Sequence, residues 1–408
     1  MHESYDVCVV GGGAAGMSAA IAAAQQGKKV CILDKNKKLG KKLYATGNGR
    51  CNLANADTKR SHYHSVSFCD NSDTREEFLA HCMGTDSNAS LFSFLHTIGI
   101  YERECSGYYY PSSLQASSVV WAFLDALHAL SVTIMETACV TAIKKTEQGY
   151  CLYRADHTDP IEADNVILTC GGRTYTSLGG GTEGYEILKN LDVPVSRLRP
   201  SLCGVYTEED TEEIKGVRVL CSARVDGKKD TKQQGELQIT EYGLSGIMMF
   251  NLSSEIGRLL DKNEKPLIVF DFLEQIDRET FVHPQEIHRT LLGYLNAFLP
   301  DKLASYVIKA CGLQPKQGLE TVTNSQLTEL YDTCRKFEFH VVKLKDFESA
   351  QVTAGGICLE AVNPDTMELF RYPGMYAAGE ILDIHGDCGG YNLTFAILTG
   401  LRAGSACK

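Results

Sequence analysis

Hydrophobic and polar positions change in short blocks over the first forty residues of this 408-residue chain. The apolar run YDVCVV at 5–10 is rich in β-branched residues and ends at glycines. An alanine-rich stretch without helix breakers follows at 14–26, and a second apolar run, KVCIL, occupies 29–33. Short apolar runs bounded by glycine predict strands, and the alanine-rich stretch predicts a helix. This order is the βαβ unit of a parallel sheet.

The pattern changes several times after this unit. Residues 35–60 are polar and glycine-bearing, which predicts a long loop. Residues 75–130 have mostly helical periodicity, interrupted by GYYYPSS at 107–113. Residues 130–170 alternate as strands do and end in VILTCGG.

A central insertion is indicated from Pro200 onward. Residues 200–275 contain strand-like runs such as VRVLCSARV and PLIVFDF, and residues 284–335 have the apolar spacing of helices. From residue 350 the chain returns to glycine turns and short strands. We therefore predict an α/β protein in which a nucleotide-binding domain is interrupted by a second domain.

The first glycine cluster, Gly11 to Gly16, fits the pattern G-x-G-x-x-G between a predicted strand and a predicted helix. The first glycine permits a tight turn, the second lets the backbone approach a pyrophosphate, and the third lets helix and strand pack closely. Asp34 follows the second strand, 18 positions after Gly16, where a carboxylate can accept hydrogen bonds from a ribose. The cluster predicts a dinucleotide with an unphosphorylated ribose, either NAD or FAD.

The long loop after Asp34 favours FAD. A simple NAD dehydrogenase reaches its next strand soon after the acidic residue, whereas this chain enters KKLGKKLYATGNGRCNLAN at 37–55. A second glycine turn there can carry backbone donors to the remainder of a longer cofactor.

Composition excludes several classes of protein. The formal net charge is −11, and an acidic chain does not favour nucleic-acid binding. No apolar run approaches the ~18 residues of a membrane span. The first strand starts within five residues of the N-terminus and leaves no room for a signal peptide. We expect a cytoplasmic protein that binds a small molecule and neither nucleic acid nor membrane; the sequence does not indicate an oligomeric state.

The sixteen cysteines contain no CxxC pair, and the closest two, Cys139 and Cys151, are 12 positions apart. This spacing argues against a zinc knuckle and a thioredoxin-type dithiol. His62 and His64 form an H-x-H pair, but the sequence does not provide further ligands near them. We therefore assign no metal.

Several long segments, in order, resemble the aminoacetone-oxidase-like family of bacterial FAD-binding flavoproteins, which includes bile-acid reductases. Beside the loop at 37–55, the similar segments are GYYYPSS at 107–113, VILTCGGRTYTSLGGGTEGY at 166–185, GELQITEYGLSG at 235–246, VTAGGICLEAVNPDTM at 352–367 and PGMYAAGEILDIHGDCGGYNLTFAILTG at 373–400. The resemblance covers nearly the whole chain. It implies a Rossmann-type FAD-binding domain at 1–195 and 351–408, interrupted at 196–350. The insert would be barrel-like at 196–275 and 336–350 and helical at 276–335.

The resemblance also implies the residues that bind non-covalent FAD. They are Gly11, Gly13, Ala14, Ala15, Gly16, Asp34, Lys35, Gly47, Gly49, Arg50, Cys51, Val140, Gly171, Gly172, Gly379, Glu380, Gly390, Tyr391, Asn392 and Leu393. The family usually has a third glycine where this chain has Asn48, and asparagine tolerates the left-handed backbone that such a turn needs. Residues 389–393 would open the final helix toward the flavin pyrimidine, where negative charge builds on reduction.

The predicted catalytic residues are Arg50, Tyr391 and His385, with Arg50 near the flavin or the substrate. Further candidates for proton delivery are Tyr110, Arg173 and Tyr175. The alternative for His385 is a solvated loop residue without a catalytic role. Cys51 has no partner cysteine nearby, which argues against thiol chemistry.

Two classes of function remain open. The first is an FAD oxidoreductase that takes a hydride from NAD(P)H and passes it to an unsaturated or carbonyl-bearing molecule. An enone or steroid-like compound is the most concrete substrate of this kind. Within this class, the alternative is oxidation of an amine or aminoketone by dioxygen. The second is a tRNA-directed or non-catalytic flavoprotein. The chain has one G-x-G-x-x-G motif with an acidic residue at the right spacing, so NAD(P)H would bind transiently.

Overall fold

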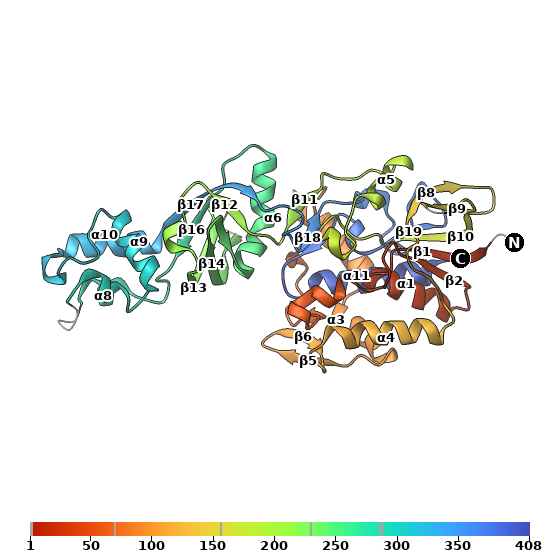
Figure 1. The fold of residues 1–408 in the computed structure, drawn as a ribbon, viewed down its shortest axis with the longest axis horizontal. Helices are drawn as coiled ribbons and strands as arrows, with labels where there is room; N and C mark the ends of the chain where they lie inside the picture. Colours follow the sequence, from red (N-terminus) through yellow and green to blue (C-terminus); the bar gives the residue numbers. More distant parts are fainter. Residues whose placement is uncertain (1–2, 69–70, 156, 229–230, 285–288) are drawn as a thin grey trace. The chain divides into compact units, whose positions relative to one another are not determined.

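The structure is a computed structural model that describes residues 3–68, 71–155, 157–228, 231–284 and 289–408. The chain divides into two compact units. The first combines Met1–Arg199 with Val352–Lys408, and the second is Pro200–Gln351. In Figure 1 the red, orange and yellow segments and the final blue segment form the first unit, and the green and cyan segments form the second.

A seven-stranded sheet is the centre of the first unit, with the order β7-β2-β1-β10-β9-β8 and with β19 paired to β10. Its strands are β1 (Ser4–Val10), β2 (Val30–Leu33), β7 (Thr133–Met135), β8 (Val140–Lys145), β9 (Tyr150–Arg154), β10 (Ile161–Leu168) and β19 (Met375–Ala377). Strands β7, β2, β1, β10 and β19 run parallel, and β8 and β9 add an antiparallel edge. All four residues of β2 are buried, as expected for a parallel strand covered on both faces. The predicted βαβ unit is confirmed.

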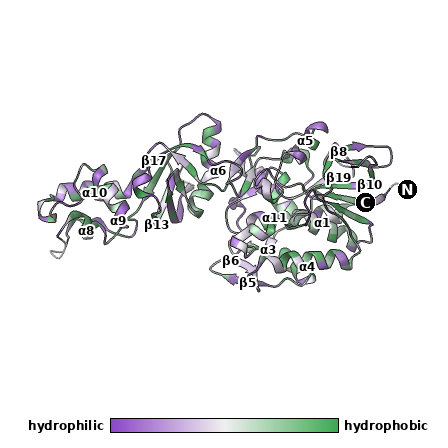
Figure 2. Cartoon of the chain, viewed as in Figure 1, coloured by the Kyte–Doolittle hydropathy of each residue, from purple (hydrophilic) through white to green (hydrophobic). Residues whose placement is uncertain are grey.

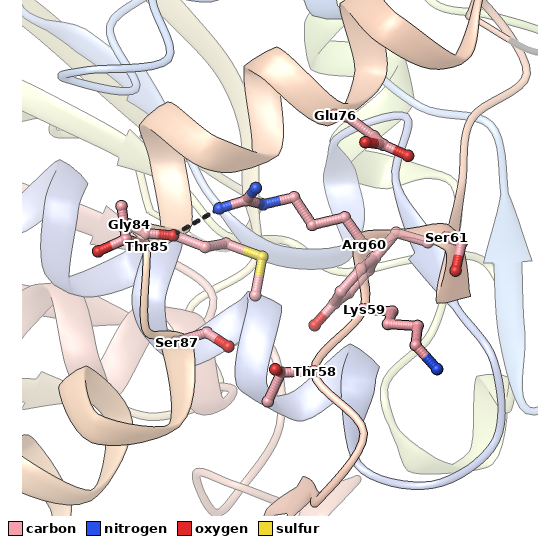
Figure 3. A pocket seen from close by; sticks show the side chains of 10 residues that line it. Thr58, Lys59, Arg60, Ser61, Glu76, Gly84, Thr85 and Ser87 are labelled. Atoms are coloured by element: carbon pink, nitrogen blue, oxygen red, sulfur yellow. Dashed lines mark hydrogen bonds between the residues drawn. The ribbon is translucent and has the colours of Figure 1, made fainter.

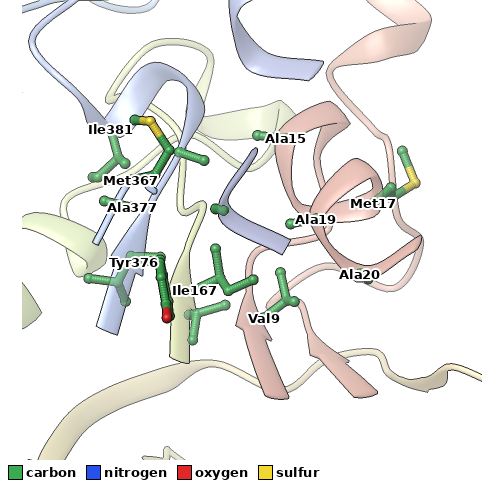
Figure 4. Packing of buried hydrophobic residues seen from close by; sticks show 14 of the residues in the cluster. Val9, Ala15, Met17, Ala19, Ala20, Ile167, Met367, Tyr376, Ala377 and Ile381 are labelled. Carbon is green, nitrogen blue, oxygen red and sulfur yellow. The ribbon is translucent and has the colours of Figure 1, made fainter. Parts of the chain in front are cut away.

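Two helices, α1 (Ala14–Gln25) and α11 (Tyr391–Ala406), pack against each other with almost no space between their backbones. A Cβ added to Gly400 would lie 2.2 Å from the carbonyl oxygen of Ala15, and one added to Gly404 would lie 2.1 Å from that of Ala19. Figure 4 shows Ala15 and Ala19 on α1 beside Val9 and Ile167 of the sheet. The alanines and glycines that the sequence places in these helices allow this close approach.

The remaining helices of the first unit are α2 (Ser72–Met83), α3 (Ser87–Thr97), α4 (Ala116–Ala129) and α5 (Glu183–Asn190). Asn71 and Asp86 cap α2 and α3 by accepting hydrogen bonds from the backbone N–H groups of Thr74 and Ala89. The predicted interruption at GYYYPSS is a small sheet of order β3-β6-β5, made of β3 (Ala54–Asn55), β5 (Glu102–Cys105) and β6 (Tyr108–Pro111). In a second small sheet, β4 (Tyr63–His64) pairs with β20 (His385–Gly386). Strands β11 (Arg199–Ser201) and β18 (Val352–Ala354) stand where the chain leaves and re-enters this unit.

A closed antiparallel barrel of order β12-β15-β14-β13-β16-β17 forms the core of the second unit. Its strands are β12 (Val205–Thr207), β13 (Arg218–Val225), β14 (Gln233–Thr240), β15 (Gly243–Ser245), β16 (Leu267–Asp271) and β17 (Phe337–Leu344). The region 200–275 also contains a helix that the sequence interpretation did not include, α6 (Ile247–Asp261). Met248, Leu252 and Ile256 bury its apolar face, which packs on β14 and β17. Their spacing is that of a helix, and it is easily overlooked between two strands.

The predicted helical region lies between β16 and β17 and contains α7 (Arg278–Val282), α8 (Leu291–Leu295), α9 (Asp301–Ala310) and α10 (Asn324–Arg335). The prediction for residues 285–288 lies outside the described residues. Phe281 is buried against Tyr294, Phe298 and Tyr331. Figure 2 shows hydrophobic residues along the strands and the inner helix faces, with hydrophilic residues on the surface loops. Within the described part of the chain, no helix is both long enough and apolar enough to span a membrane.

The α1–α11 contact gives a testable prediction. Gly404→Ala should lower the free energy of unfolding by about 1–3 kcal/mol, because the new methyl group must displace the Ala19 backbone. Thermal unfolding of the flavin-free protein measures the effect. Ser405→Ala on the exposed side of the same helix is the control. Equal unfolding temperatures for the two variants would show that α1 and α11 do not pack this closely.

Candidate functional site

The turn between β1 and α1 is built from glycines with different surroundings. Gly11 has φ +107°, and a Cβ there would lie 2.4 Å from the Thr169 carbonyl oxygen. A Cβ on Gly16 would lie 1.9 Å from the Gly11 carbonyl oxygen. Gly13, in contrast, has an ordinary φ of −79°, and a Cβ there would meet no atom within 4 Å. Gly11 and Gly16 are therefore required by the fold, whereas Gly13 borders open space at the start of α1.

The N-terminus of α1 is open to an anion. Its N-cap is Gly13, with no capping side chain and no acidic residue in the first turn. The first backbone N–H groups of Ala14, Ala15 and Gly16 point out of the helix end, as in known phosphate sites. These residues were predicted to lie along the pyrophosphate.

Asp34 lies at the end of β2, and its carboxylate is 8% exposed. Oδ2 accepts a hydrogen bond from the Gly12 N–H at 2.7 Å, and Oδ1 accepts from the Asn36 backbone and side-chain nitrogens at 2.7 and 2.9 Å. A carboxylate has about four acceptor positions, so one remains for a ribose hydroxyl. The backbone thus fixes Asp34 beside the glycine turn, where the sequence predicted a ribose acceptor.

Lys35 and Val140 lie at the same corner. The Lys35 ammonium group forms an ion pair with Glu183 at 2.7 Å and donates to the Gly180 carbonyl at 3.2 Å. The chain itself thus holds the ammonium group of Lys35. Val140 is buried at the start of β8, two residues after Ala138, whose N–H donates to the Asp34 carbonyl at 2.8 Å.

A second group of residues approaches α1 from β19. Gly379 has φ +76°, and a Cβ there would lie 2.8 Å from the Cβ of Ala15. The adjacent Glu380 forms an ion pair with Lys42 at 2.9 Å and accepts from the Thr353 N–H at 3.0 Å. A Cβ on Gly172 would lie 2.5 Å from Glu380 Oε1, which brings the two predicted turns into contact.

Lys42 and Thr353 were absent from the predicted site. Lys42 is one of several lysines in the loop, and its sequence context does not distinguish it from its neighbours. Thr353 lies in β18, where its hydroxyl accepts from the Arg173 N–H at 2.8 Å. Only the tertiary fold brings both residues to Glu380.

The second glycine cluster forms a tight left-handed turn. The φ values of Gly47, Asn48 and Gly49 are +55°, +53° and +81°, and that of Cys51 is +60°. The prediction that Asn48 adopts a left-handed conformation is confirmed. Cys51 is fully buried, and burial raises the pKa of its thiol to about 11, so it stays protonated at neutral pH. That agrees with the sequence argument against thiol chemistry.

Arg50 projects from the same turn and is exposed. Among the described residues no hydrogen bond or ion pair holds its guanidinium group. The positive charge of Arg50 acts on Tyr110. Burial and Tyr108 raise the pKa of the Tyr110 hydroxyl, and Arg50 partly opposes this rise. A Cβ on Gly47 would lie 3.6 Å from the Tyr110 ring. Arg50 and Tyr110 therefore both lie at the glycine turn.

The N-terminus of α11 is the third component. Gly389 and Gly390 have φ values of +125° and +98°, and a Cβ on Gly390 would lie 2.6 Å from the Ala54 Cα. The helix starts without a capping side chain and without an acidic residue in its first turn. Its N–H groups at Tyr391 and Asn392 are therefore available to an electron-rich ring, whereas the Leu393 N–H already donates to the Gly390 carbonyl at 3.1 Å.

Tyr391 and His385 do not have the geometry of the catalytic residues that the sequence predicted. Tyr391 is 5% exposed, and its hydroxyl donates to the Asp57 carbonyl at 2.8 Å. His385 is 1% exposed in β20, opposite His64, so it is not a solvated loop residue. Burial, with His64 and Arg199 nearby, lowers the His385 pKa well below its usual value. A buried neutral imidazole is a poor acid at physiological pH.

The two open helix ends have a spacing that suits FAD. Ala15 packs on Gly400 and Ala19 on Gly404, so α1 and α11 run in the same direction. Nine residues of α11 precede Gly400 and one of α1 precedes Ala15, so α11 extends eight residues further, or about 12 Å. A cofactor with phosphates at one end and a flavin ring at the other can bridge this offset. The glycine turn, Asp34 and both helix ends fit FAD.

A family model described as the HI0933-like protein Rossmann domain matches residues 5–406. The chain belongs to this family. HI0933-like proteins have an FAD-binding Rossmann domain, in agreement with the resemblance found in the sequence and with the sheet described above.

Two relatives of this chain have names that concern reduction and RNA. The chain is 32% identical over 98% of both chains to the 3-dehydro-bile acid delta(4,6)-reductase of Clostridium scindens. It is 26% identical to the ribosomal RNA dihydrouridine synthase of Escherichia coli, over 97% of this chain and 96% of that protein. Family membership and the reductase relative identify this chain as an FAD-dependent oxidoreductase.

Solved structures extend the fold comparison. The 3-ketosteroid-delta4-(5alpha)-dehydrogenase of Rhodococcus jostii RHA1 has a TM-score of 0.51 at 15% identity, covering 99% of this chain and 97% of that one. The 3-ketosteroid delta1-dehydrogenase of Sterolibacterium denitrificans has a TM-score of 0.52 at 12% identity, covering 99% of each chain. At these identities the likeness concerns the fold alone.

The contrast between two glycines gives a prediction for cofactor binding. Gly13→Val should fold as the flavin-free wild type does, because a Cβ there meets no protein atom within 4 Å, yet lose FAD retention by roughly tenfold or more, because the valine would occupy the phosphate position. Gly16→Val should instead destabilise the fold itself. FAD content after gel filtration and thermal unfolding separate the two effects. Full FAD content in Gly13→Val would refute this placement of the pyrophosphate.

Proposed function

We propose that this FAD-dependent oxidoreductase reduces a carbon–carbon double bond conjugated to a carbonyl group in a steroid-like small molecule, with NAD(P)H as the hydride source. The sequence identity of 32% to a bile-acid delta(4,6)-reductase, over 98% of this chain, supports this substrate class. The observation that carries the proposal is Arg50, an exposed guanidinium group without a hydrogen-bond partner among the described residues, on the turn expected beside the flavin.

The chemistry requires two groups from the chain. FAD, when bound, supplies a hydride acceptor and donor. Addition of hydride to the β-carbon of an enone moves negative charge to the carbonyl oxygen, and Arg50 can donate hydrogen bonds to that oxygen. The α-carbon then takes a proton, so that a hydride and a proton together convert the double bond to a single bond.

Tyr110 is the best candidate for the proton donor. Burial raises the pKa of its hydroxyl, so the proton stays on Oη at neutral pH, while the charge of Arg50 opposes this rise and would ease its release. Tyr391 is less suitable, because its hydroxyl is committed to the Asp57 carbonyl.

A uracil ring in RNA is a second candidate substrate, supported by the relatives in Escherichia coli and Haemophilus influenzae that are named ribosomal RNA dihydrouridine synthase, both at 26% identity. Its reducible double bond is also conjugated to a carbonyl, so the same residues would serve. The net charge of −11 does not favour an RNA substrate. We place the enzyme in the cytoplasm, whose reducing environment would keep the fifteen described cysteines as thiols.

Two stopped-flow experiments distinguish these functions. In the first, the flavin is reduced anaerobically with NADH or NADPH, and its reoxidation is followed after addition of 4-androstene-3,17-dione or a uridine-rich RNA. In the second, the oxidised flavin is mixed with an aminoketone and then exposed to dioxygen. Rapid reoxidation by the enone with formation of the saturated ketone supports the proposal. Reoxidation by RNA alone favours the second candidate. Flavin reduction by the aminoketone followed by rapid reaction with dioxygen would replace both with an oxidase.

The role of Arg50 gives a further prediction. Arg50→Ala should retain FAD and lose roughly 10²-fold or more in the rate of enone reduction, the scale seen when one oxyanion donor is removed. Arg50→Lys should recover part of the rate, because it restores the charge without the planar donor pair. Stopped-flow absorbance resolves flavin reduction from reoxidation, and Arg371→Ala, at an exposed ion pair with Asp192, is the control. Wild-type rates in both half-reactions would make Arg50 structural.

A further inference from the structure

A pocket of about 380 Å³ lies beside β4, and it does not by itself identify a ligand. Its wall combines the cations Lys59 and Arg60 with Glu76 and several hydroxyl groups. Figure 3 shows Arg60 spanning the pocket, with its guanidinium group bonded to the Gly84 carbonyl. Tyr63 also lines the pocket and packs edge-on against Tyr391 at the start of α11. The titratable groups next to these two tyrosines have a clearer geometry.

Two paired segments carry a group of titratable side chains. Residues 62–64 contain His62 and His64, and residues 385–387, just before α11, contain His385 and Asp387. His385 of β20 is opposite His64 of β4, and the Asp387 N–H donates to the His62 carbonyl at 2.9 Å. Asp387 is 7% exposed overall, and its carboxylate binds His62 Nδ1 at 2.9 Å and His64 Nε2 at 2.8 Å. The H-x-H pair of the sequence thus shares one buried carboxylate.

His62 lies between two carboxylates. Its Nδ1 faces Asp387, and its Nε2 is 3.3 Å from Asp57 Oδ2. A neutral imidazole carries only one N–H, so only the protonated ring can donate to both. The hydrogen bond to Asp387, supported by Asp57 and opposed by burial, raises the His62 pKa.

The same ring contacts the start of α11. His62 stacks on Tyr391 with ring centroids 4.6 Å apart and an interplanar angle of 22°. The Tyr391 hydroxyl in turn donates to the backbone carbonyl of Asp57. The His62 ring, the start of α11 and Asp57 are therefore all in contact with Tyr391 or part of the same helix start. Asp387 is three residues before the N-cap Gly390.

With His64 neutral, the charges around His62 balance only when His62 is protonated. The neighbouring groups are Asp387, Asp57 with its partner Lys59 at 3.1 Å, and the stacked ring of Tyr391. His64 can donate to Asp387 in either charge state, and His385, near Arg75 and Arg199, is neutral. With His62 protonated, two carboxylates face two cations. Without that proton, one uncompensated negative charge lies behind the helix end.

We propose that His62 is a positioning residue that couples pH to flavin reduction, because its proton neutralises Asp387 behind the α11 N-terminus, where the reduced cofactor gains negative charge. The inference rests on the expected flavin position at α11 and not on the substrate. Linkage makes the coupling reciprocal, so reduction of the flavin must tighten proton binding to His62. As the pH rises through the raised pKa of His62, that proton is lost and reduction becomes less favourable.

Histidine NMR tests this coupling directly. The holoprotein is titrated with the flavin oxidised and then reduced by dithionite, and the His62 ring signal is assigned from its loss in His62→Gln. We expect its proton affinity to rise by roughly tenfold on reduction, because a negative charge then forms at the α11 N-terminus and charges near a protein surface interact at a low effective dielectric constant. His81, which is bound to Asp365 at an exposed site, should show no change and serves as the control.

A second variant and a second readout cover the case in which His62→Gln does not fold. Asp57→Asn, on the exposed loop, should lower the His62 pKa while the reduction-linked increase remains. Proton uptake per flavin reduced should exceed one in the wild type near the His62 pKa, and in Asp57→Asn this excess should move to lower pH. An unchanged His62 titration on reduction would overturn the inference. An intact coupling without enone turnover would instead overturn only the proposed substrate.

Discussion

The contact between α1 and α11 is the constraint on which the site depends. Gly400 and Gly404 leave no space for a side chain against the backbone of α1, and Gly379 approaches Ala15 from β19. The two helices are therefore aligned in the same direction, with α11 extending about 12 Å further. Because each begins on a glycine without a side-chain cap, the packing that holds the core together also sets two positive helix ends at a fixed spacing.

A few side chains determine the charge near the N-terminus of α11. The uncapped N-terminus of α11 favours negative charge on a bound ring, whereas Asp387, three residues before the N-cap, opposes it. His62 and His64 both bind this carboxylate, and Arg50 brings a further positive charge on the 47–51 turn. The chain thus surrounds the place expected for the flavin with groups whose net effect depends on one histidine proton. Such an arrangement suits an enzyme whose cofactor alternates between neutral and negative forms.

Local patterns were sufficient for much of this protein. The βαβ unit, the left-handed Asn48 and the final helix after Gly390 follow from apolar runs and glycine positions. Helix α6 was missed because its apolar spacing lies between strand-like runs. Lys42 could not be selected from a lysine-rich loop, because its ion pair with Glu380 joins residues 338 positions apart. The burial of His385 could not be read from the sequence, because it depends on a strand pairing that only the folded chain creates.

The account is tested most directly by a crystal structure of the protein purified with its cofactor. It predicts FAD with its pyrophosphate at the N–H groups of Ala14 and Ala15, a ribose hydroxyl on Asp34, and the flavin pyrimidine at the start of α11. Electron density for the flavin away from residues 390–393, or for a pyrophosphate away from Gly13, would contradict the claim that two aligned helix ends hold the cofactor.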